Sequence, residues 1–443
     1  MSVRGRRFVE FWRENGATAA VKLIRRKLGD AIAGRAIFSE EDNESNARAV
    51  SQVLASRFMS QQALEVCEVA QPSVRRVSMV TDSIGSESLF GGVGTALLFA
   101  AQLANRMNAV LRVVTRNEVP SPANALQILN AYGIKLRQDV EFAFAPPRND
   151  PTATPSVIDT VPSLDVYPGE IFVTTSWWTT SAALASVPAA SIVYLLQEDE
   201  RMFYAFGEDR VHCERVLRNQ HIRFVVNTRL LYDYLMATGL DHLGRSGFWF
   251  EPAFPRSLFH PRPREAGAKK RFFFYARPNN PRNLFHIGLG IIDRAVNEGI
   301  LDLARWEIFL VGKDIPHVKF GVDYMPQRCE GLGWEAYAEF AGTIDLGLSL
   351  MYTPHPSYPP FDLAASGAVV VTNSFANKQD LSNYSPNILC VELETEALLG
   401  ALRTGVAIAN DREIRDRNFA ANTLGTDWTS AFVDVLGALA ATR

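Results

Sequence analysis

Short apolar runs alternate with longer apolar segments of helical spacing from about residue 75 onward. The runs are rich in β-branched and aromatic residues, which favours buried strands, and the longer segments favour helices. Strands alternating with helices predict a parallel sheet covered on both faces. In the first half of the chain we expect strands at 77–81, 111–115, 140–145, 171–175, 191–196 and 222–226, and helices at 91–105 and 123–132.

A proline-rich stretch interrupts this alternation after residue 250 and ends in Ala266-Gly267-Ala268-Lys269-Lys270, which is typical of an interdomain linker. Its prolines are Pro252, Pro255, Pro261 and Pro263. The alternation then resumes. We expect strands at 271–276, 306–311, 344–350, 368–372 and 388–391, a helix at 283–298, and a last amphipathic helix at 428–440.

The pattern therefore predicts an α/β chain with two doubly wound, Rossmann-like domains that face a cleft, where such sheets bind ligands. We place a helical extension at 1–66 and the first domain at 67–255. The second domain covers 256–425. A C-terminal helix, 426–443, is expected to cross back onto the first domain.

The N-terminal segment is basic and amphipathic. Over residues 1–30, Phe8, Phe11 and Trp12 lie among many arginines. Such a stretch can lie on an anionic membrane surface, and the alternative is a helix that packs on its own domain. Charges interrupt it where a signal peptide would be apolar. The most apolar stretch, 89–104, is shorter than the roughly 20 residues of a membrane span. We expect a cytoplasmic protein, with peripheral contact to the inner membrane face if residues 1–30 bind lipid.

Composition excludes several classes of function. The chain has 443 residues, is 47% hydrophobic, and carries a net charge of −3, so it is not built to coat nucleic acid. No metal site built from protein side chains is expected, because the four cysteines form no CxxC pair and the seven histidines form no HExxH motif. The cysteines, which fit reduced thiols, are Cys67, Cys213, Cys329 and Cys390.

A glycine-rich loop joins the first strand to the first helix. Gly91, Gly92 and Gly94 would let backbone N–H groups approach a ligand at the helix N-terminus. The loop is not a P-loop, because no Gly-Lys-Ser/Thr follows, and Leu97 stands where a dinucleotide fingerprint needs its third glycine. A tight structural turn explains the glycines equally well.

Two arginines follow the first strand of the second domain. Arg277 and Arg282 lie in a loop stiffened by Pro278 and Pro281 that opens a helix. Two guanidiniums at such a junction can grip a diphosphate with the help of the helix dipole. The alternative is a pair of surface arginines that cap a turn, which their position at a strand end disfavours.

A second loop, His-Pro-Ser-Tyr-Pro-Pro-Phe-Asp, follows the strand that ends at Met351. Pro359 or Pro360 suits the first position of a helix, and the loop before it would aim free amides at an anion. Asp362, one turn into that helix, can accept hydrogen bonds from a ribose diol.

A fourth candidate is the segment Gln197-Glu198-Asp199-Glu200-Arg201-Met-Phe203-Tyr204, at the end of a first-domain strand. Carboxylates beside aromatic rings suit the recognition of sugar hydroxyls, and a solvated helix start is an equal alternative. The pair Trp177-Trp178 follows another strand and offers either a stacking surface or core packing.

These motifs, in this order, resemble the retaining GT-B glycosyltransferases of family 4, and more narrowly their WsaF-like rhamnosyltransferase branch. The resemblance extends roughly from Arg75 to the C-terminus. It rests on Tyr-Ala-Arg-Pro...Pro-Arg-Asn-Leu-Phe, His-Pro-Ser-Tyr-Pro-Pro-Phe-Asp-Leu-Ala and Gln-Glu-Asp-Glu-Arg-Met-Phe-Tyr. It implies a second domain that holds a nucleotide sugar and a first domain that holds the acceptor.

The resemblance also implies roles for residues. It gives the diphosphate, and the catalytic stabilisation of its charge, to Arg277 and Arg282. The donor site would further include Gly91, Gly92, Gly333, Trp334, His355, Ser357, Tyr358 and Asp362. The acceptor and sugar would meet Trp178, Gln197, Glu198, Glu200 and Tyr204.

The chain departs from the wider family in three places. Pro354 stands where an acid is usual, eight positions before the ribose-binding residue. Gln197-Glu198 replaces a histidine common after a first-domain strand. The ribose-binding glutamate of the family is the shorter Asp362 here.

The function implied is retaining transfer of L-rhamnose from dTDP-L-rhamnose to a glycan or lipid-linked glycan acceptor, with no metal or other cofactor. Phe203, Tyr204 and Tyr358 would shelter the methyl group of the 6-deoxy sugar. Alternatives are a UDP- or GDP-linked donor and a non-catalytic glycan-binding relative. An NAD-dependent oxidoreductase would need, besides an acid such as Glu118, the fingerprint that the glycine loop lacks.

Overall fold

The computed structural model describes residues 49–70, 74–85, 88–89, 91–147 and 163–441. Residues 49–62 form a small unit of their own, with helix α2 (Val50–Arg57), and the other described residues form one compact unit. The basic segment 1–30 lies outside the described residues, so its membrane contact stays a prediction. Among the described helices, none is both long and apolar enough to cross a membrane.

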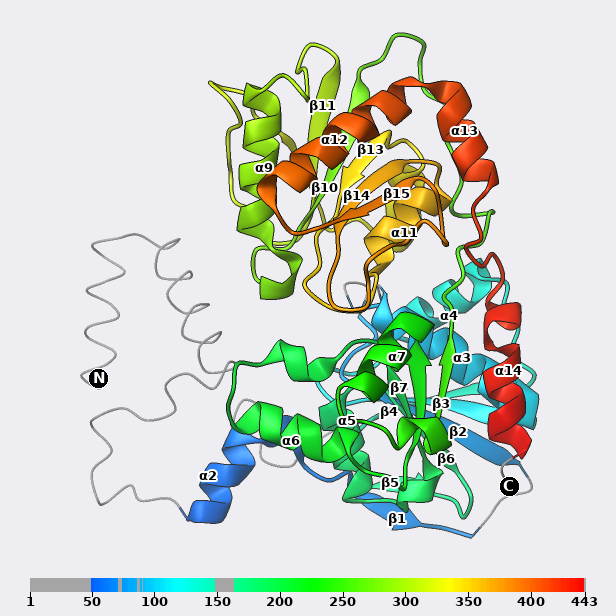
Figure 1. The fold of residues 1–443 in the computed structure, drawn as a ribbon. Coiled ribbons are helices and arrows are strands. Elements are labelled where there is room, and N and C mark those ends of the chain that lie inside the picture. The colour runs from blue at the N-terminus through cyan, green and yellow to red at the C-terminus, as the bar shows by residue number, and fades with distance from the viewer. Residues whose placement is uncertain (1–48, 71–73, 86–87, 90, 148–162, 442–443) are drawn as a thin grey trace, which may run out of the picture. The chain divides into compact units, whose positions relative to one another are not determined.

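The first sheet of the larger unit has seven parallel strands in the order β4-β3-β2-β6-β7-β8-β9 (Figure 1). The strands are β2 (Arg75–Thr81), β3 (Ala109–Thr115), β4 (Val140–Phe144), β6 (Ile171–Thr174), β7 (Ile192–Leu196), β8 (Arg223–Asn227) and β9 (Gly247–Phe250). Strand β2 is the first strand of this sheet in chain order, and it pairs with β3 on one side and with β6 on the other. The strand order therefore reverses at β2, which makes this position a topological switch point.

Helices connect these strands: α3 (Gly92–Met107), α4 (Pro122–Ala131), α5 (Trp177–Leu184), α6 (Glu208–Leu217), α7 (Arg229–Ala237) and α8 (Leu243–Ser246). Helix α3 is buried over most of its length, which explains its apolar sequence. Its start needs glycine, because a Cβ at Gly94 would lie 2.6 Å from the Leu89 carbonyl oxygen. The glycine loop thus has a packing role at Gly94.

The second sheet has six parallel strands in the order β12-β11-β10-β13-β14-β15. They are β10 (Lys270–Ala276), β11 (Trp306–Gly312), β12 (Gln327–Glu330), β13 (Leu346–Leu348), β14 (Val369–Asn373) and β15 (Ile388–Val391). Its helices are α9 (Phe285–Asn297), α10 (Trp334–Ala341), α11 (Tyr358–Ala365), α12 (Thr395–Asn410) and α13 (Arg412–Ala420). Here the switch point lies between β10 and β13.

Both predicted doubly wound sheets are therefore confirmed, with a strand at every expected position. Four strands were not predicted: β9, β12, and the pair β1 (Val66–Glu68) and β5 (Leu164–Val166), which form a separate two-stranded sheet. Strand β12 reads Gln-Arg-Cys-Glu and lies at a sheet edge, so it lacks the apolar run of a central strand. Between β9 and β10 there is neither helix nor strand, as expected of a linker, only an isolated bridge from Ala253 to Gly425.

The C-terminal helix α14 (Trp428–Ala441) packs on the first domain, against α3 and β9, as predicted (Figure 1). Phe432 is fully buried there. Its ring centroid lies 5.3 Å from that of Phe99 and 4.9 Å from that of Phe250. The last helix of the chain thus completes the hydrophobic core of the first sheet.

Replacing Phe432 by alanine should destabilise the protein by about 3–5 kcal/mol, because it empties a fully buried aromatic site. Thermal unfolding of the purified chain measures this as a lower unfolding temperature. Val433→Ala is the matched control on the same helix: its side chain is 59% exposed, so its effect should stay within about 0.5 kcal/mol. Equal effects of both substitutions would contradict the docking of α14.

Candidate active site

Two loops meet at the switch point of the second sheet. One leaves β10 and carries Arg277 and Arg282, and the other leaves β13 and carries His355. The Tyr352 N–H donates to the Arg282 carbonyl at 2.8 Å, which joins the two loops directly. In open parallel sheets this is the place where ligands bind.

Arg282 reaches residues of the first domain. It lies in a 3₁₀ helix, Pro281–Asn283, whose start is capped by the Asn280 side chain. Its guanidinium carbon lies 4.1 Å from the centre of the Phe203 ring. Its Nη1 donates to Glu198 Oε2 at 3.2 Å. The ring and the carboxylate together hold the guanidinium in one orientation.

Arg277 takes a different partner. Its Nη1 donates to the Tyr275 hydroxyl at 3.3 Å, and its side chain is half-buried. The two arginines predicted to act together are thus placed by different contacts. Their joint action on one diphosphate stays a prediction.

The loop before α11 is buried and tightly turned. Ser357 has a φ of 71° and precedes α11, so Tyr358 takes the first helical position, and Pro359 and Pro360 follow it rather than open the helix. The Ser357 N–H donates to His355 Nδ1 at 3.0 Å. Burial lowers the pKa of His355 to about 3, so its imidazole is neutral. Its Nε2 is buried without a hydrogen-bond partner.

Glu198 contacts both loops of the second domain, the one that carries Arg282 and the one that carries His355. Besides Arg282, it contacts Thr353 Oγ1 and His355 Nδ1, each 3.4 Å from its Oε1. Burial raises the pKa of Glu198 to about 7, although the charges of Arg282 and Lys378 oppose that rise. The Glu198 carboxyl group therefore titrates near neutral pH, and pKa values shifted in this way are common at functional sites.

Lys378 was not predicted from the sequence. It lies in the loop after β14 and is fully buried, and its Nζ donates to the Met351 carbonyl at 3.0 Å. Burial lowers the pKa of Lys378 to about 8. The surrounding Asn-Lys-Gln-Asp sequence is typical of an exposed turn. Its position after a strand of the second sheet was the one sequence feature that could have indicated it.

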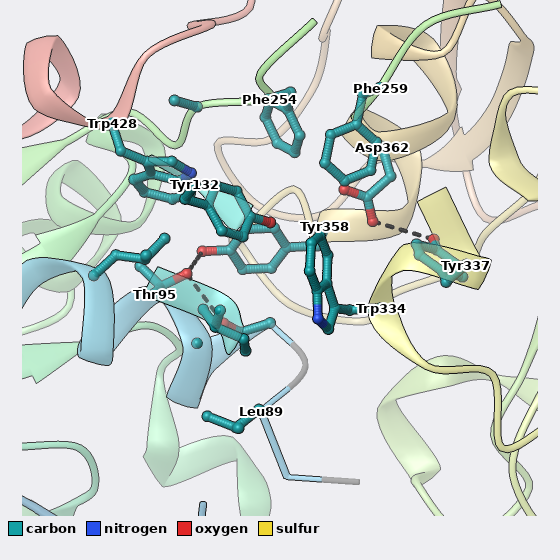
Figure 2. A pocket seen from close by; sticks show the side chains of 15 residues that line it. Leu89, Thr95, Tyr132, Phe254, Phe259, Trp334, Tyr337, Tyr358, Asp362 and Trp428 are labelled. Atoms are coloured by element: carbon teal, nitrogen blue, oxygen red, sulfur yellow. Dashed lines mark hydrogen bonds between the residues drawn. The ribbon is translucent and has the colours of Figure 1, made fainter. Parts of the chain in front are cut away.

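An aromatic pocket of about 80 Å³ lies next to the group of Glu198, Arg282, His355 and Lys378 (Figure 2). Four predicted donor-site residues line it: Gly91, Trp334, Tyr358 and Asp362. Other lining residues, from both domains and the C-terminal helix, include Leu89, Thr95, Tyr132, Phe254, Phe259, Tyr337 and Trp428. Ligand pockets usually exceed about 300 Å³, so a nucleotide would need side chains here to move.

Two polar groups in this pocket are held firmly. Asp362 accepts a hydrogen bond from the Tyr337 hydroxyl at 3.1 Å, and burial raises the pKa of Asp362 to about 8 (Figure 2). The Tyr358 hydroxyl lies 2.6 Å from Thr95 Oγ1 and accepts from Asn227 Nδ2 at 2.9 Å. Tyr358 therefore joins the second domain to α3 and the end of β8.

The structure gives the candidate residues of the first domain different hydrogen-bond partners. Gln197 Nε2 donates to the Gly92 carbonyl at 2.6 Å, which ties the end of β7 to the glycine loop. The Trp178 indole donates to Asp82 Oδ2 at 2.8 Å. Asp82 directly follows β2, so its carboxylate is a further polar group at this sheet edge that sequence reasoning missed.

Glu200 and Tyr204 serve the first domain itself. Glu200 is buried, and its carboxylate accepts from the Trp177 N–H at 2.7 Å, at the start of α5. The solvated helix start is therefore wrong for Glu200, and its role in sugar recognition stays a prediction. The Trp177 indole donates to the Tyr204 hydroxyl at 2.9 Å. Because Phe203 lies on Arg282, the three rings expected to shelter a sugar methyl group have different partners.

One candidate, Gly333, remains at the edge of the site. Gly333 is exposed and directly precedes α10, whose first residue, Trp334, lines the pocket. Within the described part of the chain, no three His, Cys, Asp or Glu side chains gather as metal ligands.

Two family models match this chain. The model of the WsaF N-terminal domain matches residues 76–229, and that of the WsaF C-terminal domain matches residues 270–403. Together they cover more than half of the chain. The chain is also 31% identical, over 252 residues, to the O-antigen biosynthesis protein RfbC of Myxococcus xanthus. That match covers 57% of this chain but 19% of the relative, which is much longer.

Solved structures with a similar fold are glycosyltransferases. Sucrose-phosphate synthase from Thermosynechococcus elongatus aligns with a TM-score of 0.52 and 12% identity, over 83% of this chain and 98% of its own. Anabaena Alr3699/HepE in complex with UDP-glucose aligns with a TM-score of 0.53 and 11% identity, over 83% and 98%. The UDP-forming α,α-trehalose-phosphate synthase of Burkholderia vietnamiensis aligns at 0.52 and 11%, over 82% and 99%. Identities this low establish the GT-B fold and nothing finer.

The buried Asp362 makes stability depend on pH. Because its pKa rises from 3.8 to about 8 on folding, the folded state keeps a proton that the unfolded chain loses, so stability falls as the pH rises through this window. Asp362→Asn should therefore raise the unfolding temperature at pH 8 by at least about 2–4 °C, the shift for 1 kcal/mol in a large domain. At pH 4 the difference should vanish.

Asp380→Asn is the control for this titration. Hydrogen bonds from Ser382 lower the pKa of Asp380, so that substitution should not stabilise the protein at pH 8. A lower unfolding temperature of Asp362→Asn at pH 8, or an equal gain at both pH values, would contradict the buried, protonated carboxyl group.

Proposed function

The chain belongs to the WsaF family, and from this premise we propose that it is a retaining glycosyltransferase that moves L-rhamnose from dTDP-L-rhamnose to a bacterial surface glycan. The Myxococcus xanthus relative, an O-antigen biosynthesis protein, supports a glycan acceptor. The Anabaena protein, which was solved in complex with UDP-glucose, supports a nucleotide-sugar donor. The acceptor is a glycan or a lipid-linked glycan.

One observation carries the proposal. Two cations from different loops of the second sheet, Arg282 and Lys378, act on one buried carboxylate, Glu198, at the switch point. Each of these two cations would match a phosphate group. A diphosphate that enters from the pocket side would meet the neutral His355 Nε2 as a further donor.

The proposed chemistry needs charge stabilisation more than a protein nucleophile. In same-face attack the sugar leaves the diphosphate while the acceptor hydroxyl approaches, and the diphosphate accepts the hydroxyl proton. Arg282, with Arg277 from the same loop, would stabilise the charge that develops on the leaving group. In this scheme the guanidiniums and the N-terminus of α11 take the place of a metal ion. Asp362 would accept from the ribose hydroxyl.

Loss of Arg282 should weaken nucleotide diphosphate binding. A charged hydrogen bond contributes about 1.5–3 kcal/mol, so Arg282→Ala should raise the Kd for dTDP about tenfold or more, at about 1.4 kcal/mol per decade. Arg277→Ala should do the same if both arginines hold the diphosphate. Isothermal titration calorimetry measures both. Arg294→Ala, on the exposed face of α9 and paired with Glu298, is the control and should leave the Kd unchanged. Unchanged affinity in both loop variants would refute the diphosphate site.

The donor is tested by comparing nucleotides and then sugars. We expect dTDP to bind more tightly than UDP or GDP, and dTDP-L-rhamnose to be turned over with retention and in the presence of EDTA. One methyl contact is worth only about 0.8 kcal/mol, so discrimination against related deoxy sugars should be modest. Preference for UDP or GDP would leave a glycosyltransferase with another donor. Nucleotide-sugar binding without transfer or hydrolysis would favour the non-catalytic relative.

A further inference from the structure

Glu198 lies in the first domain but takes its partners from the second. Its Oε2 accepts from Arg282, and its Oε1 faces Thr353 and His355. Its side chain is 16% exposed, and that of Arg282 is 20% exposed. The carboxylate therefore stands, largely out of water, on the same guanidinium that we assign to the diphosphate.

The other charged groups around Glu198 are already committed. Asp199 is paired with Arg201, at 2.8 Å between Oδ2 and Nη2. Glu200 caps the start of α5 through the Trp177 N–H. Lys378 is held by the Met351 carbonyl, and His355 is neutral. Among the described residues, Arg282 is therefore the cation in direct contact with the Glu198 carboxylate, and the charge of Lys378 adds to its effect.

Both protonation states of Glu198 have a partner in place. The ionised carboxylate has Arg282 at Oε2. A protonated carboxyl group would have an acceptor at Oε1, because Thr353 Oγ1 lies 3.4 Å away and can direct its own hydrogen to the His355 carbonyl at 3.3 Å. A carboxylate that keeps its charge next to an arriving diphosphate would face a like charge in a poorly hydrated site, which is costly. A proton removes that repulsion without leaving the carboxyl group unsatisfied.

We propose that Glu198 pairs with Arg282 in the empty site and that Arg282 leaves this pair to bind the diphosphate. Glu198 then takes up one proton from solvent. Glu198 is in this sense a positioning residue, and donor binding is coupled to its protonation. The proposal rests on the proposed function, since it assumes a diphosphate on Arg282. The reaction is an exchange of partners: the guanidinium leaves one anion for another, and the released carboxylate becomes a carboxyl group that donates to Thr353 Oγ1.

The test is proton uptake during binding. Nucleotide sugars suit it, because their diphosphate is a diester and carries constant charge near neutral pH. Calorimetry with dTDP-L-rhamnose and with UDP-glucose, at pH 7 in two buffers of different ionisation enthalpy, gives the number of protons bound. Since the pKa of Glu198 is about 7, the wild type should take up about half a proton.

Two variants identify the group that takes the proton. Lys378→Arg keeps a charge that cannot titrate, so uptake should persist in it. Glu198→Gln in the Lys378→Arg background should bind without uptake. Glu118→Gln, an acid that accepts from Ser83 at the edge of the first sheet, is the matched control and should behave as the wild type. Circular dichroism checks that each variant is folded.

The outcomes separate the two proposals. If the Glu198→Gln variant does not fold, Lys378→Arg by itself still decides, because coupled uptake by Glu198 makes its affinity fall severalfold between pH 7 and pH 8. Binding without uptake, or uptake that disappears in Lys378→Arg, would overturn the role of Glu198 and leave the donor site intact. No binding of either nucleotide sugar to the wild type would overturn the proposed function and this inference with it.

Discussion

A charge removed from water needs a partner of opposite sign, and in this protein that requirement joins the two sheets. Glu198 follows β7 of the first sheet, and its counter-charges Arg282 and Lys378 follow β10 and β14 of the second. Removing either side would leave an uncompensated buried charge, which typically costs several kcal/mol. The ion pair therefore selects an arrangement in which the strand ends of both sheets contribute to one site.

A second contact, formed by uncharged groups, also joins the two sheets. The Tyr358 hydroxyl, from the start of α11, is bonded to Thr95 of α3 and to Asn227 at the end of β8. The aromatic pocket that it lines is small, and the oxygens of Tyr358, Tyr337 and Asp362 in it already bond within the protein. A ligand would have to replace these contacts, so the empty site is held together by the same atoms that binding would use.

The buried ionisable groups of the site lower the stability of the protein, and packing elsewhere in the fold must offset that loss. Burial moves the pKa of Asp362, His355 and Lys378 toward the neutral form of each, as expected where function requires ionisable groups away from water. The compensation lies in the cores. Helix α3 is buried almost throughout, and α14 returns from the end of the chain to add Phe432 to the same core.

The sequence by itself determined the two sheets, the linker, the last helix, and the loops that carry Arg277, Arg282 and Asp362. Apolar runs are local features, and in a parallel sheet each run must be a buried strand whose following loop lies at one edge. Which loops meet at that edge is not local. It depends on strand order, which sets β10 between β11 and β13, and on how deeply each side chain is buried. Only the tertiary structure could therefore bring Lys378 into the site and bury Glu200 at the start of α5, because a lysine in a polar turn and an acid in an acidic run look equally exposed in sequence.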